Sequence, residues 1–260
     1  MDTLKHQTIL LTGASRGIGA AMAEQLADPT VTLLLTARAE DRLQNVAQAA
    51  SAHGAHTVIY PQDLAQPGAA TVLFDRVQAD GFAPTVLINN AGFGKKGAFE
   101  AEDVATYEAM LTLNVTNLVS LTRLCLPAML DAGRGGILNV ASTAAYQPLP
   151  FFAAYGASKA FVLNFSEALH EEYAPRGITV TCLSPGSTQT AFHERSGAPT
   201  DILGPQSTPE DVAQDGLRAL RSGKRSHISG WRNAVGGIVG RIAPRAAALK
   251  VSRFLFGPKR

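Results

Sequence analysis

Short apolar runs alternate with longer segments of helical periodicity along most of the chain. We predict strands at the apolar runs 8–11, 31–36, 56–60, 85–88, 136–140, 178–183 and 227–229. The same pattern predicts helices at 20–27, 41–53, 152–173 and 209–220, and a helix in two pieces over 100–130. Strands that alternate with helices are typical of a parallel sheet with helices packed on its faces.

Three residues within these segments allow more specific predictions of local structure. Pro67 stands where a further helix would open, because proline suits the first helical turn. Asn114 is an amide inside an apolar helix, so it needs a partner: either its own helix, or a role that holds a water or stabilises a kink. His170 is followed by Glu171 and Glu172, which favours a solvated helix face.

The composition narrows the classes of function. A chain of 260 residues with a net charge of +2 is expected to fold as one domain and not to bind nucleic acid. Cys125 and Cys182 lie in apolar segments, which favours packing roles in a cytoplasmic protein, and we predict no metal site. No apolar run reaches the about 18 residues of a membrane span, so a secreted or membrane-spanning protein is not expected.

A glycine-rich turn joins the first predicted strand to the first predicted helix. Its spacing is Gly-x3-Gly-x-Gly, which departs from the Gly-x-Gly-x-x-Gly fingerprint of many dinucleotide folds. Glycines let a backbone approach a ligand closely, and the free N–H groups of the following helix attract phosphate. The residues expected to bind a cofactor here are Gly13, Ser15, Arg16, Gly17, Ile18 and Gly19.

The second and third strands end in residues that bear on the choice of cofactor. Where a fold that prefers NAD carries an acid for the ribose hydroxyls, this chain has Ala37 and Arg38. Arg38 and Arg16 could both bind a 2′-phosphate, or they could be solvated surface residues. Asp63, followed by Leu64, could accept a hydrogen bond from an adenine amino group or serve as a turn residue.

Tyr155 and Lys159 are four residues apart at the start of a predicted helix, so their side chains share one helical face. A cation held close to a phenol favours the phenolate and lowers the pKa of tyrosine. Ser142 follows the fifth strand, and a substrate oxygen could sit between its hydroxyl and Tyr155. The Tyr-x3-Lys spacing alone also occurs by chance on helix surfaces, so the surrounding motifs decide its meaning.

Other candidate residues follow the fourth and sixth strands. Small and amide residues there suit a backbone that packs against a cofactor, and hydroxyls after a rigid turn could hold a carboxamide. These cofactor candidates are Asn90, Ala91, Gly92, Pro185, Gly186, Thr188 and Thr190. Residues 191–207 are expected to form a lid over the substrate. The aromatic residues Phe93, Tyr146, Phe152 and Phe192 indicate an apolar substrate, with ordinary core packing as the alternative.

The C-terminal tail combines positive charge with helical apolar spacing. About half of the 23 basic residues follow Asp215, the last acid of the chain. Apolar residues recur at helical spacing over 235–242, and Pro244 can open a second helix. We expect residues 1–230 to form the nucleotide-binding and catalytic domain and residues 231–260 to form a basic amphipathic tail. Such a tail can lie on a membrane surface, or pack on the domain or a partner subunit.

These motifs, in this order, resemble those of the short-chain dehydrogenase/reductase family over residues 8–190. The motifs that carry the resemblance are Thr12-Gly13-x3-Gly17-x-Gly19, Asn89-Asn90-Ala91-Gly92, Asn114, Ser142 with Tyr155-x3-Lys159, and Pro185-Gly186. The resemblance implies a single-domain, Rossmann-like, doubly wound parallel α/β sheet of about seven strands. The implied strand order is 3-2-1-4-5-6-7, with helices on both faces, and a homodimer or homotetramer is expected.

The resemblance also implies roles for the candidate site residues. Tyr155 would be the general acid that protonates a carbonyl oxygen, while Ser142 steadies that oxygen. Lys159 would lower the pKa of the tyrosine and bind the nicotinamide ribose together with Tyr155, and Asn114 would hold a water in a proton relay. The expected cofactor is NADP(H) rather than NAD(H), and the expected substrate is a carbonyl or an alcohol.

Two other functions are compatible with parts of the pattern. A redox sensor could keep the nucleotide fold without turnover, but it would not need Ser142, Tyr155 and Lys159 together. An epimerase or a dehydratase can also use Tyr-x3-Lys, but the short chain disfavours it.

Overall fold

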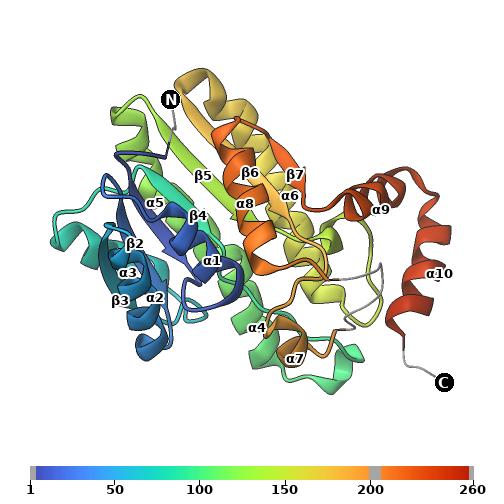
Figure 1. Ribbon diagram of the computed structural model, residues 1–260. Coiled ribbons are helices and arrows are strands. Elements are labelled where there is room, and N and C mark those ends of the chain that lie inside the picture. The colour runs from blue at the N-terminus through green and yellow to red at the C-terminus, as the bar shows by residue number, and fades with distance from the viewer. Residues whose placement is uncertain (1–3, 199–205, 258–260) are drawn as a thin grey trace.

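A seven-stranded parallel sheet forms the centre of the protein in the computed structural model, which describes residues 4–198 and 206–257 (Figure 1). The strands are β1 (Thr8–Thr12), β2 (Thr32–Ala37), β3 (His56–Pro61), β4 (Val86–Asn89), β5 (Gly135–Val140), β6 (Ile178–Ser184) and β7 (Ser226–Ile228). Their order in the sheet is β3-β2-β1-β4-β5-β6-β7. The predicted fold class and strand order are therefore confirmed.

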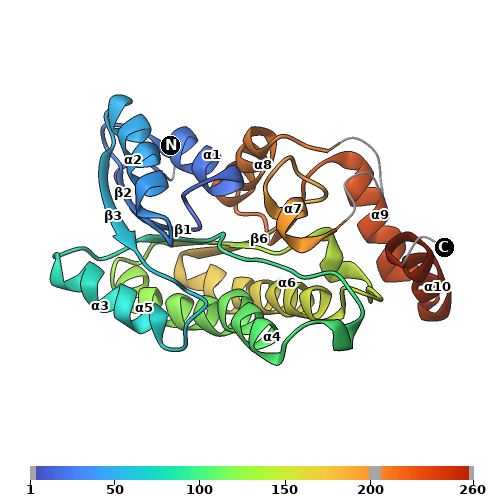
Figure 2. The same ribbon diagram turned by 90° about the horizontal axis from the view of Figure 1, so that it is seen from below.

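Helices cover both faces of the sheet, as Figure 2 shows. On one face lie α1 (Gly17–Leu26), α2 (Glu40–Ala52) and α8 (Pro209–Arg221). On the other face lie α3 (Ala69–Ala79), α4 (Val104–Leu111), α5 (Asn117–Asp131) and α6 (Ala153–Tyr173). Short 3-10 turns are found at η1 (Phe99–Ala101), η3 (Thr143–Tyr146) and η4 (Ala174–Arg176), and η2 (Thr112–Thr116) is a π-helix between α4 and α5.

The core follows from the alternation of side chains along each strand. In β1, Ile9 and Leu11 are buried in the cluster that includes α1, α2 and α8, whereas Leu10 is buried in the cluster that includes α3 and α5. A strand that is covered on both faces needs apolar residues at every position. This requirement explains why the strands appear in the sequence as continuous apolar runs.

The order of the strands places a crevice at the carboxyl ends of β1 and β4. Chain connections run in opposite directions from this point, and ligands of open parallel sheets bind at such a crevice. Asn90 joins its two sides. Its backbone N–H donates to Thr12 Oγ1 at 3.0 Å, and its Nδ2 donates to the carbonyl oxygens of Thr12 and Gly13 at 3.0 and 3.1 Å.

The structure corrects the prediction that Pro67 opens a helix. The helix α3 begins two residues later, after Gly68, whose φ of +73° is left-handed. A tertiary contact fixes this start, because Asn117 Oδ1 accepts a hydrogen bond from Ala70 N at 3.3 Å while its Nδ2 donates to Leu64 O at 2.7 Å. A local proline rule could not anticipate an amide from another helix.

The expectation of a solvated His170 is also wrong. Its Nδ1 lies 2.8 Å from the carbonyl oxygen of Val180, and the side chain is half-buried between α6 and β6. Glu171 and Glu172 are exposed as expected. The histidine therefore joins the last turn of the helix to the sheet.

The helical stretch from α4 to α5, Val104–Asp131, has 28 residues and contains an 18-residue window with a mean hydropathy of 1.3, so by length and composition alone it could cross a membrane. Its α5 part packs in the core through Leu121, Cys125 and Met129. This packing is what a core helix of a globular domain requires.

The chain beyond the last strand forms two helices, α9 (Trp231–Ile242) and α10 (Arg245–Phe256), at one end of the molecule (Figure 1). Pro244 directly precedes α10, as predicted. The predicted lid, 191–207, lies partly outside the described residues. Its described beginning forms the short helix α7 (Phe192–Ser196).

Candidate active site

The glycine-rich turn is shaped for close approach of the backbone. Gly13 and Gly17 have positive φ angles of 66° and 55°, which favour glycine. A Cβ on Gly19 would collide with the carbonyl oxygen of Gly13 and lie 2.6 Å from Asn90 Nδ2. A Cβ on Gly17 would lie 2.9 Å from Thr190 Cγ2, so this glycine makes room for the loop after β6.

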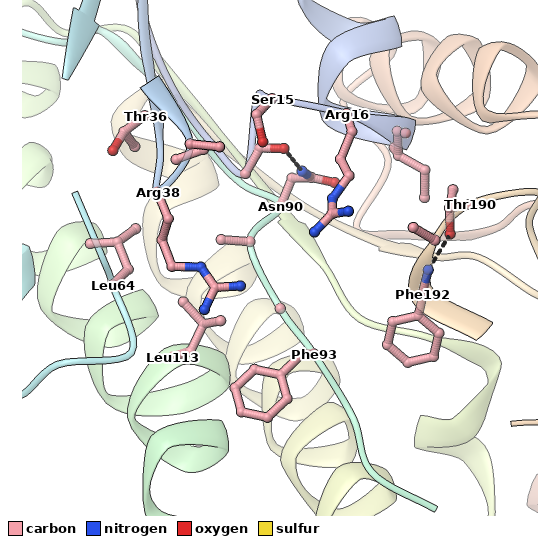
Figure 3. A pocket seen from close by; sticks show the side chains of 18 of the residues that line it. Ser15, Arg16, Thr36, Arg38, Leu64, Asn90, Phe93, Leu113, Thr190 and Phe192 are labelled. Atoms are coloured by element: carbon pink, nitrogen blue, oxygen red, sulfur yellow. Dashed lines mark hydrogen bonds between the residues drawn. The ribbon is translucent and has the colours of Figure 1, made fainter. Parts of the chain in front are cut away.

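A cavity of about 410 Å³ opens beside this turn (Figure 3). It is lined by most of the residues predicted to bind a cofactor, namely Gly13, Ser15, Arg16, Gly17, Ile18, Arg38, Asp63, Leu64, Asn90, Ala91, Gly92 and Thr190. Sequence reasoning missed other lining residues, namely Thr36, Ala39, Arg42, Gln62, Leu113 and Arg195. We call this space the nucleotide cavity.

Four arginines from three parts of the chain line the nucleotide cavity: Arg16, Arg38, Arg42 and Arg195. Figure 3 shows the guanidinium groups of Arg16 and Arg38 directed into the same space. Burial lowers the pKa of Arg16, and the charges of Arg42 and Arg38 lower it further. Like charges gathered in this way form a site for a multiply charged anion.

Asp63 is the only acid among the described residues that line the nucleotide cavity. Its Oδ1 accepts a hydrogen bond from Ala65 N at 3.0 Å, which is a turn contact two residues along the chain. The carboxylate is thus fixed by its own turn while it lines the cavity. Both interpretations made from the sequence fit this geometry.

A second cavity, of about 430 Å³, contains the candidate catalytic residues. Ser142, Tyr155 and Lys159 line it, together with Pro185, Gly186 and Thr188 from the loop after β6. Ile18, Asn90, Gly92, Thr190 and Phe192 line both cavities. A ligand can therefore extend from the arginines to the tyrosine, and we call the second space the substrate cavity.

Tyr155 and Lys159 are both buried in the first turns of α6. The ring of Tyr155 stacks on Phe152, with centroids 4.4 Å apart, and lies 5.3 Å from the ring of Phe192. Lys159 Nζ donates to the carbonyl oxygen of Val140 at 2.8 Å and lies 5.9 Å from the centroid of the Tyr155 ring. The end of β5 therefore holds the ammonium group directly behind the phenol.

The pKa values differ from the expectation for this pair. Burial raises the pKa of Tyr155 to about 12, against the opposing effect of its hydrogen bond with Ser142. Burial also lowers the pKa of Lys159 to about 8. The predicted lowering of the tyrosine pKa by Lys159 is therefore not what the protein alone produces, because burial of the phenol dominates and only the hydrogen bond with Ser142 opposes it.

Asn114 lies in the π-helix η2 and is fully buried. Its Oδ1 accepts from Phe93 N at 3.2 Å, while its Nδ2 donates to Phe93 O at 2.9 Å and to Ser158 Oγ at 3.1 Å. A Cβ on Gly92 would lie 3.1 Å from Asn114 Oδ1 and 3.2 Å from Lys159 Nζ. The amide thus bonds the loop after β4 and α6 rather than its own helix, and it stabilises a π-bulge, a feature common at functional sites.

The walls of the substrate cavity come from distant parts of the chain. Tyr146, Phe152 and Phe192 line it as predicted, but Phe93 lines the nucleotide cavity instead. The backbone of Phe93 is held by Asn114, which directs the residue to that side. Much of the remaining wall is formed by small and apolar residues of the tail, namely Gly236, Gly240, Ala243, Ala248, Val251, Leu255 and Phe256.

His193, to which the sequence assigned no role, also lines the substrate cavity. Its Nε2 lies 3.1 Å from Ser187 Oγ.

Among the described residues, no group of three or more His, Cys, Asp or Glu side chains is placed to hold a metal ion.

A family model and a similar protein both relate this chain to dehydrogenases and reductases. A family model described as short chain dehydrogenase matches residues 7–200. The chain is 32% identical over 223 residues to the ketoacyl reductase HetN of Nostoc sp., which covers 85% of this chain and 78% of that protein.

Two solved structures show the same fold. A short-chain dehydrogenase from Sphingobium yanoikuyae in complex with NADPH is 30% identical, with a TM-score of 0.80 over 98% of this chain and 96% of that one. A 3-ketoacyl-(acyl-carrier-protein) reductase from Brucella melitensis complexed with NADH is 25% identical, with a TM-score of 0.78 over 88% of this chain and 99% of that one. Both relatives carry a nicotinamide cofactor, one with and one without the 2′-phosphate.

Proposed function

This chain belongs to the short-chain dehydrogenase family, and on that premise we propose that it transfers a hydride between NADP(H) and an apolar carbonyl or alcohol. One observation carries the proposal: Ser142, Tyr155 and Lys159 lie together in a cavity that adjoins the nucleotide cavity. Reduction of a carbonyl by hydride needs a proton donor for the oxygen, next to the place where the cofactor meets its substrate. This arrangement meets that requirement.

Ser142, Tyr155 and Lys159 have separate roles in the proposed reaction. When bound, the nicotinamide supplies or accepts the hydride, and the protein supplies position and protons. Tyr155 gives its phenolic proton to the carbonyl oxygen in the reductive direction and takes it back in the oxidative direction. Ser142 would donate a hydrogen bond to the same oxygen, and Lys159, whose ammonium lies 5.9 Å from the Tyr155 ring, would supply positive charge to the phenol and a donor to the cofactor ribose.

The raised pKa of Tyr155 fits the role of a proton donor. With a pKa of about 12 the phenol is neutral at physiological pH, which is the form that a carbonyl reduction requires. In the oxidative direction the phenol would have to ionise. The positive charge of Lys159, and the positive nicotinamide of the oxidised cofactor, would both favour that ionisation.

The arginines favour NADP(H) over NAD(H). Arg16 lies within the glycine turn, Arg38 follows β2, and Arg42 lies on the first turn of α2, so three separate positions direct positive charge at the same nucleotide cavity. Ala37 leaves no carboxylate to repel a phosphate. Guanidinium groups match phosphate geometry through paired hydrogen bonds.

The substrate cavity favours an apolar substrate. Its walls combine aromatic side chains with the small and aliphatic residues of α9 and α10, and Ser142 and Tyr155 are the polar groups that would bind the reacting oxygen. The ketoacyl names of two relatives fit a substrate with an acyl chain. We therefore propose aliphatic or aromatic ketones, aldehydes and acyl compounds as the first substrates to test.

A screen of NADPH consumption across these compounds tests the proposal. We expect turnover with at least one apolar carbonyl, and a higher kcat/KM with NADPH than with NADH. Binding of NADPH without turnover on any carbonyl or alcohol would favour a redox sensor. Turnover with NADH alone would overturn the choice of cofactor while leaving the class of reaction intact.

A further inference from the structure

The short helix α7 contributes side chains to both cavities. Phe192, its first residue, lines both cavities and lies 5.3 Å from the ring of Tyr155. Arg195, three residues later, lines the nucleotide cavity. Residues three apart on a helix lie on neighbouring positions of one face. The same face of α7 therefore reaches the proposed catalytic residue and the arginine cluster.

Arg195 belongs to the arginine cluster by its electrostatics as well as by its position. Burial lowers its pKa, and the charges of Arg16, Arg38 and Arg42 lower it further. Within residues 4–198 and 206–257, none of these four guanidinium groups makes an ion pair or donates a side-chain hydrogen bond. Glu194 raises the pKa of Arg16 but makes no ion pair with it, so the cluster keeps an excess of positive charge that a bound anion would relieve.

The tertiary hydrogen bonds that fix α7 do not involve the side chain of Arg195. The backbone N–H of Lys96 donates to the carbonyl oxygen of Ser196 at 2.8 Å, and His193 lies against Ser187. These contacts fix the C-terminal end of α7 and its His193, which lines the substrate cavity, but not Arg195; a helix of five residues is too short to be stable by its own hydrogen bonds. A ligand that bound Arg195 would therefore add a further point of attachment for α7.

We propose that Arg195 is a specificity residue that binds the 2′-phosphate of NADP(H) together with Arg16 and Arg38, and that this contact positions Phe192 over Tyr155. The inference rests on the proposed use of NADP(H). Under this proposal α7, which lines the substrate cavity, also binds the cofactor phosphate. Recognition of the phosphate and assembly of the substrate cavity are then coupled through α7.

Calorimetric titration of the full-length protein separates the phosphate contact from the rest of cofactor binding. The probes are NADPH, NADH and adenosine 2′,5′-bisphosphate. We expect Arg195→Ala to weaken binding of NADPH and of the bisphosphate by about tenfold, as for the loss of a hydrogen bond between charged groups, and to leave NADH binding unchanged. Arg195→Lys should recover part of the loss, because it keeps the charge but not the planar fork.

The matched control is Arg134→Ala, which removes an exposed arginine at the opposite end of the sheet, before β5. This variant should bind all three probes like the wild type. If the wild type prefers NADPH and Arg195→Ala keeps that full preference, our inference is overturned while the proposed function stands. If the wild type binds NADPH and NADH equally, our inference and the proposed choice of cofactor are both overturned, while the proposed hydride transfer is not.

Steady-state kinetics test the coupling through α7. With NADPH, Arg195→Ala should raise the KM for the carbonyl substrate severalfold, because Phe192 is no longer held in place. With NADH the variant and the wild type should have the same substrate KM, since no phosphate is present to engage the arginine. An equal increase in KM with both cofactors would mean that Arg195 only supports the fold of α7, and it would overturn the coupling.

Discussion

At the scale of single residues, we expect Arg38, which follows β2, to discriminate between two closely related cofactors. We expect Arg38→Ala to remove most of the preference for NADPH, because the guanidinium group binds only the cofactor that carries a 2′-phosphate. The wild type should bind NADPH at least about tenfold, ~1.4 kcal/mol, more tightly than NADH. Fluorescence titration with both cofactors measures this difference, and equal affinities in the wild type would contradict it.

The buried ammonium of Lys159 makes a prediction about stability. Burial lowers its pKa from the usual 10.5 to about 8, so between these values the unfolded chain binds a proton that the folded protein does not. The free energy of unfolding attributable to this group should therefore rise as pH increases from about 8 to about 10.5, by at most about 3 kcal/mol.

Denaturant unfolding of the wild type and of Lys159→Met across this range isolates the effect, because all other titrating groups are shared. The difference between the two proteins should shift in favour of the wild type with rising pH and should be constant below about pH 8. A difference that does not change with pH would show that the lysine keeps its ordinary pKa in the folded state.

At the scale of elements, the glycine turn between β1 and α1 is the most restrictive backbone feature of the nucleotide cavity. Gly19→Ala would place a methyl group against the carbonyl oxygen of Gly13 and the amide of Asn90. We expect NADPH affinity to fall at least about tenfold, and stability to fall by about 1–3 kcal/mol, as for overpacking of a tight site. Unchanged affinity in a folded variant would mean that this turn does not shape the cofactor site.

Gly68→Ala is a control for Gly19→Ala. No atom lies within 4 Å of a Cβ at this position, which has a φ of +73°. The substitution should cost some stability through backbone strain, but it should leave NADPH affinity unchanged, because a Cβ on Gly68 meets no residue of the nucleotide cavity. Gly19 does not line the cavity itself, but a Cβ there would meet Gly13 and Asn90, which do.

The elements that could be predicted from the sequence are those whose cause is local. The strands are apolar because both faces of the sheet are covered, and the glycine motif follows the first strand directly in the chain. The start of α3, the π-bulge at Asn114 and the contact of His170 depend on partners in other elements of the chain. For the same reason Arg195 was missed as a neighbour of Arg38, whereas Arg42, only four residues from Arg38, could have been found from the first turn of the helix that follows.

At the scale of the whole molecule, the tail has two faces with different surroundings. One face of α9 and α10 lines the substrate cavity, which supports the expectation that the tail packs on its own domain. The other face exposes large apolar side chains: Trp231, Ile242 and Phe254 are 74%, 77% and 87% exposed. Exposed apolar surface of this kind marks an interaction site.

We expect this face to be buried between subunits of a homodimer or homotetramer. Analytical ultracentrifugation should show an oligomer for the wild type and a smaller species for Ile242→Glu. A monomeric wild type that sediments with anionic vesicles at low salt, but not with neutral vesicles, would contradict this expectation and assign the face to a membrane surface. The cytoplasmic location stays a prediction.

In the proposed reaction, Tyr155 transfers the proton that accompanies hydride transfer. The most direct test is the kcat of Tyr155→Phe on a carbonyl substrate, measured together with its affinity for NADPH. The variant keeps the ring that stacks on Phe152 and loses only the hydroxyl, so it should bind NADPH like the wild type while kcat falls by about 10²–10⁴-fold. A variant that keeps a kcat near that of the wild type would contradict the account.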